Sequence, residues 1–477
     1  MKEHFHIPDP ILHQIGLIAD RDSVRVYVVG GYVRDLLLGR QVKDIDIVVE
    51  GSGIDFARVV AREFNEAQVV VFEKFGTAML PLRDRKIEFV GARKESYQKD
   101  SRKPAVAGGT LEEDLSRRDF TVNAIAVSLN ADTFGTLHDP FFGQHDLAAK
   151  ILRTPLEPAA TFADDPLRIM RAMRFASQLG FSIEPNAFQA AKEMGHRLTI
   201  VSQERISDEF LKVMASPKPS IGLSLLHECG VMNGIFPEVA QLGGVDQRKD
   251  YHHKDVFLHT LKVVDTVAEK SSNIWLRMVA LLHDIAKPRT KSYKEGIGWT
   301  FHGHEELGAR MAKSIFRRMK FPLEFVPYIE KLVRLHLRPM ALVDEGVTDS
   351  AVRRLLFEAG NEVDDLMILC RADITSKNPK LVAQVLENYD LVAQKMNEVE
   401  EKDRMRNWQP PLRGEEIMLV CGLEPGKLVG VLKETVTDAI LDGRIPNDHD
   451  AALQYLLDVK ESIISLFQKD GKSAHNR

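Results

Sequence analysis

Residues 28–51, VVGGYVRDLLLGRQVKDIDIVVEG, carry two acidic side chains on a run that is otherwise apolar and strand-like. Successive side chains of a strand point to opposite faces, so Asp44 and Asp46 share one face, about 6.6 Å apart at Cα, while Ile45 and Ile47 share the other. Two such carboxylates can hold a pair of divalent ions, the arrangement that an in-line phosphoryl displacement uses. The residues alone leave a second interpretation open, in which Asp44 caps a turn and Asp46 lies solvated.

Gly30 and Gly31 precede this run, at the end of one expected strand and the start of an expected helix. Bare backbone N–H groups at a helix start can receive a triphosphate, and Arg34 can add a charged contact there. The stretch therefore predicts a phosphate site beside an acidic metal site.

Length and composition limit the class of protein. The 477 residues exceed what one hydrophobic core organises and predict three or four units. With 44% hydrophobic and 28% charged residues, the chain is globular, which excludes fibrous and wholly disordered classes. The net charge of -5 gives no overall attraction to nucleic acid, so RNA binding has to come from local clusters of Lys and Arg.

The chain shows no apolar signal core and no run of about eighteen apolar residues, so we expect no membrane segment and a cytoplasmic location. Short runs rich in Val, Ile and Phe alternate with helical patterns from residue 24 to about residue 90. After about residue 151, amphipathic helical patterns fill the chain. The fold class is therefore α+β, with a mixed sheet and helices first and all-helical regions after it.

Four more motifs follow the opening stretch: LEEDLSRRDFTVNAIAV (111–127), DPFFGQHDLAAKILR (139–153), DDPLRIMRAMRFASQLGF (164–181) and ERISDEF (204–210). In this order they resemble the polymerase-beta-like nucleotidyltransferase superfamily that contains the class II tRNA CCA-adding enzymes and bacterial poly(A) polymerases. The resemblance implies transfer of CMP and AMP from CTP and ATP to the 3′ end of tRNA. Asp44 and Asp46 would be the catalytic ligands of Mg²⁺, with Glu88 on a later strand as an alternative third carboxylate.

The same resemblance assigns the sugar and phosphates of the incoming nucleotide to Arg117, Arg118 and Asp119, with Asn123 nearby. Guanidinium groups offer forked donors to phosphate, and discrimination of ribose needs hydrogen bonds to its 2′-hydroxyl. Without the resemblance, the RRD triplet is equally well explained as a surface ion-pair cluster.

Base choice is assigned to Asp165, which would accept from an exocyclic amine, and to Arg168, which would donate to the adjacent ring nitrogen. Cytosine and adenine offer this pattern and uracil does not. The alternative is a helix cap before Pro166, a role that suits Asp164 better than Asp165. Further arginines of the neck are expected to bind nucleotides, pair with acidic neighbours or meet tRNA phosphates: Arg171, Arg174, Arg197 and Arg205.

Residues 92–109, ARKESYQKDSRKPAVAGG, read as a flexible basic loop. In the CCA-adding subgroup a loop of this length accompanies the switch from adding C to adding A. It favours complete CCA addition.

A second group of metal-ligand residues lies further along the chain: His259, His283, Asp284, His304, His336 and Asp373. Imidazole and carboxylate together suit a divalent transition metal. The pattern resembles the HD phosphohydrolase superfamily, with Lys287 beside the phosphate, and implies a phosphatase or 2′,3′-cyclic phosphodiesterase activity.

The expected domains are a nucleotidyltransferase head (1–153), a helical neck that binds the base and RNA (154–245), an HD domain (246–400) and a helical tail (401–477). Two alternatives stay open. One is a bacterial poly(A) polymerase, which differs in primer choice and use of CTP. The other is an HD phosphohydrolase with a non-catalytic RNA-binding head, which would predict damaged head motifs.

Overall fold

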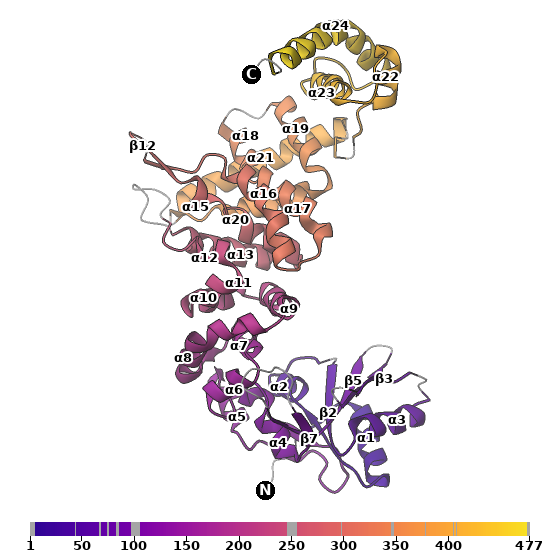
Figure 1. The fold of residues 1–477 in the computed structure, drawn as a ribbon, viewed down its shortest axis with the longest axis vertical. Helices are drawn as coiled ribbons and strands as arrows, with labels where there is room; N and C mark the ends of the chain where they lie inside the picture. The colour runs from indigo at the N-terminus through magenta and orange to yellow at the C-terminus, as the bar shows by residue number, and fades with distance from the viewer. Residues whose placement is uncertain are drawn as a thin grey trace. The chain divides into compact units, whose positions relative to one another are not determined.

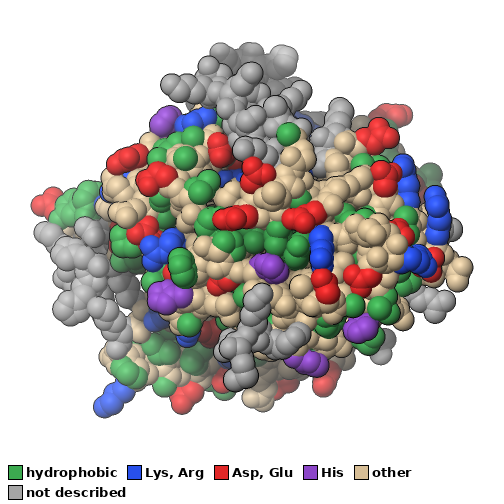
Figure 2. Space-filling view, turned by 90° about the horizontal axis from the view of Figure 1, so that it is seen from below, with side chains coloured by type: hydrophobic (Ala, Val, Ile, Leu, Met, Phe, Trp, Pro, Cys, Tyr) green, Lys and Arg blue, Asp and Glu red, His purple; other side chains and the backbone are tan. Residues whose placement is uncertain are grey.

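The computed structural model describes residues 5–42, 44–65, 68–73, 76–82, 85–96, 105–245, 255–296, 298–344, 348–376, 378–403, 405–406 and 408–474. The chain divides into two compact units, Met1–Ala240 and Gln241–Arg477, which are described separately. The finer division into head, neck, HD domain and tail stays a prediction. Charged side chains of both signs are interspersed over the face seen in Figure 2, in keeping with the net charge of -5.

A seven-stranded mixed sheet is the centre of the first unit. In sheet order its strands are β3 (Val70–Phe72), β4 (Thr77–Pro81), β5 (Lys86–Gly91), β2 (Asp44–Glu50), β1 (Arg25–Val29), β8 (Ala126–Ser128) and β9 (Leu137–His138). β2 and β5 pair in parallel, and the other neighbouring strands pair antiparallel. The expected α+β class is confirmed.

The other described elements of this unit are α1 (Pro10–Arg21), α2 (Gly31–Leu37), α3 (Gly53–Glu63), β6 (Arg93–Ser96), β7 (Ala105–Gly108), α4 (Leu111–Ser116), η2 (Thr121–Asn123), α5 (Gly143–Ala149), β10 (Ile151–Leu152), α6 (Pro158–Asp164), α7 (Leu167–Leu179), β11 (Ser182–Ile183), α8 (Pro185–Met194), η3 (Gly195–Ile200), α9 (Gln203–Met214), α10 (Pro219–Glu228), α11 (Val231–Ile235) and α12 (Pro237–Ala240).

The two faces of the sheet have different roles. α1 and α3 lie beside the sheet (Figure 1) and pack on its apolar face, where Val28, Ile47 and Phe89 are fully buried. Because side chains alternate along a strand, the residues between these point to the opposite face. There Val48 packs with Leu115 of α4 in a smaller core, next to the acidic residues of β2.

Two stretches of the first unit differ from the expectation. β6 and β7 pair antiparallel within residues 92–109, where we expected a flexible loop, and residues 97–104 of that stretch lie outside the described part. β10 and β11 form a short parallel pair after residue 151, where we expected helices only. The two strands of each pair are separated along the chain, and local periodicity does not reveal which separated segments pair.

The second unit is mainly helical. Its described elements are α13 (Val256–Lys270), α14 (Ile274–Leu282), α15 (Lys287–Thr290), β12 (Ser292–Lys294), β13 (Gly298–Thr300), α16 (His304–Arg318), η4 (Leu323–Phe325), α17 (Val326–Leu335), α18 (Arg338–Asp344), α19 (Asp349–Ala359), η5 (Gly360–Glu362), α20 (Val363–Asp373), α21 (Pro379–Asp403), α22 (Gly414–Cys421), α23 (Lys427–Leu441) and α24 (His449–Ala474).

The hairpin of β12 and β13 is a second departure from the all-helical expectation. Tyr293 pairs with Trp299 across it, and Gly296 and Gly298 adopt φ of +80° and +93° in and after the turn. Aromatic residues on both sides of these glycines were the available signal. Among the described helices of the whole chain, none is long and apolar enough to cross a membrane.

A close approach of two backbones gives a test of this packing. Gly143 opens α5 against η2, and a Cβ built on it would lie 2.2 Å from the carbonyl oxygen of Thr121. We predict that Gly143→Ala lowers the free energy of unfolding by about 1–3 kcal/mol, because the added methyl overpacks this contact. Urea unfolding measures the change.

Gly234→Ala is the matched control in the same unit. A Cβ at Gly234 meets nothing within 4 Å, and alanine inside α11 is expected to keep or raise the free energy of unfolding. Equal unfolding midpoints for Gly143→Ala and the wild type would contradict the close approach.

Candidate functional site

A cavity of about 1470 Å³ opens on the acidic face of the sheet in the first unit. Arg197, one of the further neck arginines, is not among its lining residues. The cavity is lined by the other head and neck residues that the sequence singled out: Gly30, Gly31, Arg34, Asp44, Asp46, Arg117, Arg118, Asp119, Asn123, Asp165, Arg168, Arg171, Arg174 and Arg205. The cavity therefore gathers residues that lie far apart in the chain.

Three carboxylates line one side of this cavity. The register of the parallel pair places Asp46 opposite Glu88, two residues along from Asp44. Burial raises the pKa of Asp46, and the charge of Asp44 adds to the rise against the opposing effect of Arg118. Burial and then the charge of Asp46 raise the pKa of Glu88. Burial is the main cause of both shifts, and the neighbouring carboxylate adds to each. Carboxylate oxygens gathered in this way are the ligands that Mg²⁺ prefers in proteins.

Gly30 brings the backbone close to these carboxylates. Its φ of +71° is in the left-handed region that favours glycine. A Cβ there would lie 2.9 Å from Nη1 of Arg118 and 3.7 Å from Oδ2 of Asp46. A side chain at this position would thus enter the space between the acidic and basic sides of the cavity.

Asp119 of the RRD segment is buried in a hydrogen-bond network, and Arg117 and Arg118 are partly buried, so the triplet is not the surface ion-pair cluster that was the alternative. Asn123 donates from Nδ2 to Oδ1 of Asp119 at 2.9 Å, and Arg171 donates from Nε to its Oδ2 at 2.7 Å. Arg34 donates from Nη1 to Oδ1 of Asn123 at 2.6 Å. Burial would raise the pKa of Asp119, but Arg171 and the hydrogen bond from Asn123 outweigh it and lower the pKa to about 2.

Asp165 and Arg168 already have partners inside the protein. Asp165 accepts from the backbone N–H of Leu167 at Oδ1, 3.1 Å, and from Arg205 Nη2 at Oδ2, 3.0 Å. Asp165 thus accepts from the first backbone N–H of α7, although we expected the capping role to suit Asp164 better. Arg168 donates to the carbonyl oxygens of Arg117, at 2.5 Å, and Thr161, at 3.2 Å.

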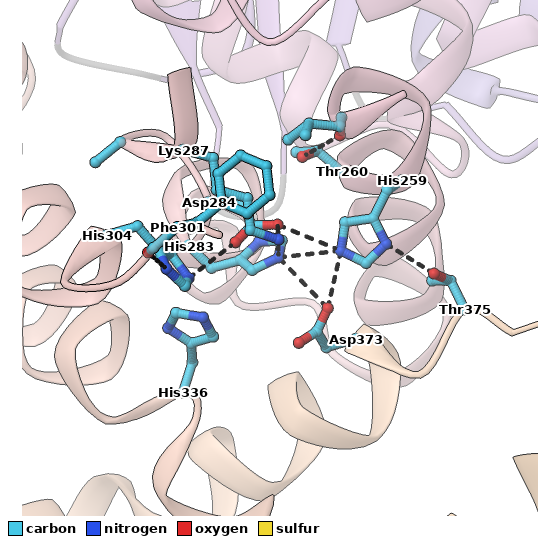
Figure 3. A network of polar contacts seen from close by, with 12 residues as sticks. His259, Thr260, His283, Asp284, Lys287, Phe301, His304, His336, Asp373 and Thr375 are labelled. Atoms are coloured by element: carbon cyan, nitrogen blue, oxygen red, sulfur yellow. Dashed lines mark hydrogen bonds and ion pairs between the residues drawn. The ribbon is translucent and has the colours of Figure 1, made fainter. Parts of the chain in front are cut away.

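A second site lies in the second unit, where six side chains converge (Figure 3). They come from α13, the ends of α14, α17 and α20, and the start of α16: His259, His283, Asp284, His304, His336 and Asp373. They form two adjoining groups of possible metal ligands, His259, His283 and Asp373 in one and Asp284, His304 and His336 in the other.

Distances across the centre are short. Nε2 of His259 lies 2.9 Å from Oδ1 of Asp373 and 3.3 Å from Nε2 of His283. Nε2 of His304 lies 3.3 Å from Oδ1 of Asp284. The other oxygen of Asp284, Oδ2, lies 2.7 Å from Nζ of Lys287. The structure therefore brings the six expected ligands together in one place.

Backbone contacts orient the imidazoles. Nδ1 of His283, of His304 and of His336 each lies 2.6 to 2.8 Å from a carbonyl oxygen, those of Ala280, Phe301 and Val333 respectively. A proton on Nδ1 donated to a carbonyl leaves the lone pair of Nε2 directed into the centre, the form that a metal ligand needs.

The donor set fits a divalent metal. Among the described residues, Nε2 of His336 is buried with no hydrogen-bond partner, and Nε2 of His304 faces Asp284 without the geometry of a hydrogen bond. Burial lowers the pKa of His283, but Asp284 and Asp373 outweigh it and raise the pKa to about 10. Burial and the charge on His283 lower the pKa of His336 to about 4. The carboxylates therefore favour positive charge at His283, whereas His336 is held in the neutral form that binds a metal.

Three segments of the chain match known protein families. Residues 26–153 match the family model described as Poly A polymerase head domain, residues 180–242 match "Probable RNA and SrmB- binding site of polymerase A", and residues 256–378 match the HD domain. The Multifunctional CCA protein of Nitrosococcus oceani is 34% identical over 375 residues, which cover 74% of this chain and 86% of that protein.

The chain belongs to the multifunctional CCA protein family. Among solved structures, a tRNA nucleotidyltransferase complexed with a primer tRNA and an incoming ATP analog is 27% identical, with a TM-score of 0.58, and the match covers 81% of this chain and 99% of that one. The CCA-adding enzyme of Bacillus stearothermophilus, in complex with CTP, is 23% identical over 96% of this chain and 99% of that one. Its TM-score of 0.65 shows a shared fold.

Two acidic residues of this site were missed or ranked low from the sequence: Glu88, which lines the cavity, and Asp114, which lies behind the cavity-lining Arg117 and Arg118. Glu88 was only an alternative, because the parallel pairing that sets it beside Asp46 cannot be read from the chain. Asp114 was missed. It is fully buried and pairs with both Arg117 and Arg118, and its spacing of three and four residues before them was the available signal.

The shifted pKa of Asp119 predicts a pH-dependent loss of stability. Its pKa falls from 3.8 to about 2 on folding, so the stabilisation is complete above 3.8 and is lost as the pH falls towards about 2. We expect Asp119→Asn to cost about 2 kcal/mol or more at neutral pH. The difference from wild type should shrink in that acidic window, as urea unfolding at a series of pH values would measure.

Asp132→Asn is the control for this measurement. Asp132 pairs with Arg25 on the surface, and the hydrogen bond from Arg25 lowers its pKa. Because exposed ion pairs add little stability, the variant should differ from the wild type far less than Asp119→Asn does at every pH. A deficit for Asp119→Asn that stays constant down to pH 2 would rule out the titration of this group as the cause.

Proposed function

We propose that the cavity of the first unit adds C, C and A to the 3′ end of tRNA, with CTP and ATP as donors. One observation carries the proposal: Asp44, Asp46 and Glu88 share a sheet face beside the buried Asp119 and Asn123. A set of cation-binding carboxylates next to a polar network suits nucleotidyl transfer. The full length of the segment 92–109 supports complete CCA addition over addition of C alone, and the intact carboxylates argue against a non-catalytic head.

The reaction joins the terminal hydroxyl oxygen of tRNA to the α-phosphorus, breaks the bond to pyrophosphate and releases the hydroxyl proton to solvent. Asp44 and Asp46, with Glu88 beside them, would hold Mg²⁺, which when bound lowers the pKa of the hydroxyl and stabilises the leaving oxygen. Arg34 and Arg118 would bind the phosphates.

The ribose and base would be read by separate groups. Asp119 and Asn123, fixed by Arg34 and Arg171, offer hydrogen bonds to the ribose. Asp165 and Arg168 would bind the Watson–Crick edge of cytosine or adenine, because a keto base presents donors and acceptors in the wrong order and leaves them unpaired. Arg174 would add positive charge.

Primer extension tests this assignment. Given a tRNA transcript that lacks CCA, with CTP, ATP or both, the protein is expected to add three nucleotides and stop. Asp46→Ala should lower the rate by about 10³-fold or more, because it removes a carboxylate that holds the charge-stabilising cations. Product lengths resolved on a gel give the result.

Asp132→Ala, on the surface of the same unit, should extend like the wild type. Ladders of A without use of CTP would instead establish a poly(A) polymerase, and extension that survives Asp46→Ala would remove this cavity from the reaction.

We further propose that the HD centre hydrolyses phosphate esters with a bound divalent transition metal. Its residues would hold the ion through His259, His283, Asp284 and Asp373, and a bound metal supplies a water nucleophile at neutral pH. His304 and His336 would complete a second position. Water adds to phosphorus, the ester bond breaks and the leaving alcohol takes a proton.

Cytoplasmic location stays a prediction of the sequence.

Metal content separates this activity from the transferase. We expect His283→Ala to lose bound transition metal by elemental analysis and, with it, phosphatase activity, while CCA addition stays within about twofold. Wild-type protein stripped with a chelator should lose hydrolysis and regain it when a divalent transition metal is added back.

The exposed His449, which pairs with Glu416, provides the control, and His449→Ala should keep metal and activity. Unchanged metal content in His283→Ala would show that this centre is not the metal site.

A further inference from the structure

The segment between two HD ligands, residues 284 to 304, carries cationic and aromatic side chains in a row. Nζ of Lys287 lies 2.7 Å from Asp284 and 5.6 Å from the centre of the Phe301 ring. The carbonyl oxygen of Phe301 in turn accepts from Nδ1 of His304 at 2.7 Å. Figure 3 shows Lys287 and Phe301 beside the ligands. Phe301 therefore contacts the HD centre twice, through its ring near Lys287 and through its carbonyl oxygen at His304.

The row continues along the β12–β13 hairpin. Trp299 stands two residues before Phe301, and Nζ of Lys291 lies 4.5 Å from the centre of its ring. The rings of Trp299 and Tyr293 meet edge to face, with centroids 5.3 Å apart. We call Lys287, Lys291, Tyr293, Trp299 and Phe301 the aromatic strip.

Packing of the protein core does not account for the strip. Tyr293 is 55% exposed, all three residues of β12 are exposed, and Trp299 and Phe301 are only partly buried. Single exposed apolar residues are ordinary on a protein surface. Here, however, two of the three rings have a lysine over them, and the row ends at a centre built to hold cations.

Rings interleaved with lysines are the chemistry that binds single-stranded nucleic acid. Every base has a face that stacks on an aromatic ring, and the lysines attract the phosphates between the bases. Trp299 lies on β13 and Phe301 is one residue past the end of this strand. Residues two apart on extended backbone are about 6.6 Å apart, a spacing at which Trp299 and Phe301 can meet successive bases of an extended RNA strand.

We propose that the aromatic strip binds the last bases of a single-stranded RNA 3′ end whose terminal phosphate lies at the HD centre. This inference rests on the proposed hydrolase function of that centre. The chemistry recognised is a nucleobase attached to a terminal phosphate. A free mononucleotide shares it, but only an RNA end extends from Phe301 as far as Trp299 and Tyr293.

Hydrolysis kinetics of the full chain test the proposal. The substrates are a five-nucleotide RNA with a 3′-phosphate, a 3′-mononucleotide and the base-free ester 4-nitrophenyl phosphate. For Trp299→Ala we expect KM for the RNA to rise about tenfold, since stacking on one ring is worth about 1–3 kcal/mol. kcat for the RNA and both constants for the base-free ester should stay within about twofold.

Two variants make the comparison specific. Trp299→Phe keeps a stacking surface and should restore most of the affinity for RNA. Ser292→Ala changes an exposed residue of the same hairpin and should behave as wild type. An equal loss for the base-free ester would assign Trp299 a structural role and overturn the proposal. An equal rise in KM for the mononucleotide would overturn the assignment to an RNA end.

Crosslinking covers the case in which the HD centre hydrolyses none of the three esters, which would defeat the hydrolase proposal by itself. The same RNA with a terminal 4-thiouridine is irradiated with the wild-type protein, and the crosslinked peptides are identified by mass spectrometry. Crosslinks within residues 291–301 would support the strip as an RNA site, and crosslinks found only elsewhere would overturn it.

Discussion

The alternation of side chains along β2 is the constraint on which the first unit depends. Ile45 and Ile47 are buried against α1 and α3, and this burial fixes the register of the strand in the sheet. A shift by one residue would bury the carboxylates of Asp44 and Asp46 in the apolar core, at a cost far above that of any surface rearrangement. The same burial that stabilises the sheet therefore holds the acidic residues at the cavity.

Opposite charges then organise the cavity wall. Asp114 and Asp119 are buried acids. Asp114 pairs with Arg117 and Arg118 of its own segment, and Asp119 pairs with Arg171 of α7. Buried ion pairs of this kind need complete hydrogen bonding to be tolerated. Asn123 completes the set for Asp119, and its own amide oxygen is taken by Arg34.

The sequence predicted what depends on local order. Period-two alternation located Asp44 and Asp46, helical periodicity located the histidines on helices, and motif order indicated the family. It ranked Glu88 low because strand pairing is a tertiary property, and it assigned the cap to Asp164 because both aspartates satisfy the same local rule. The β12–β13 hairpin was overlooked because its strands are short and lie among long helices, where periodicity over a window is dominated by its neighbours.

Arg168 has a consequence for how this protein can diverge. Its guanidinium holds the carbonyl oxygens of Arg117 and Thr161, so a group suited to reading a base also fastens α7 to the RRD segment. On the proposed role of Arg168, a replacement would alter nucleotide choice and the attachment of α7 to the RRD segment together. Selection for a different added nucleotide is therefore expected to leave this arginine unchanged. Variation in base preference among descendants of this chain should accumulate at the periphery, in residues that carry one task only.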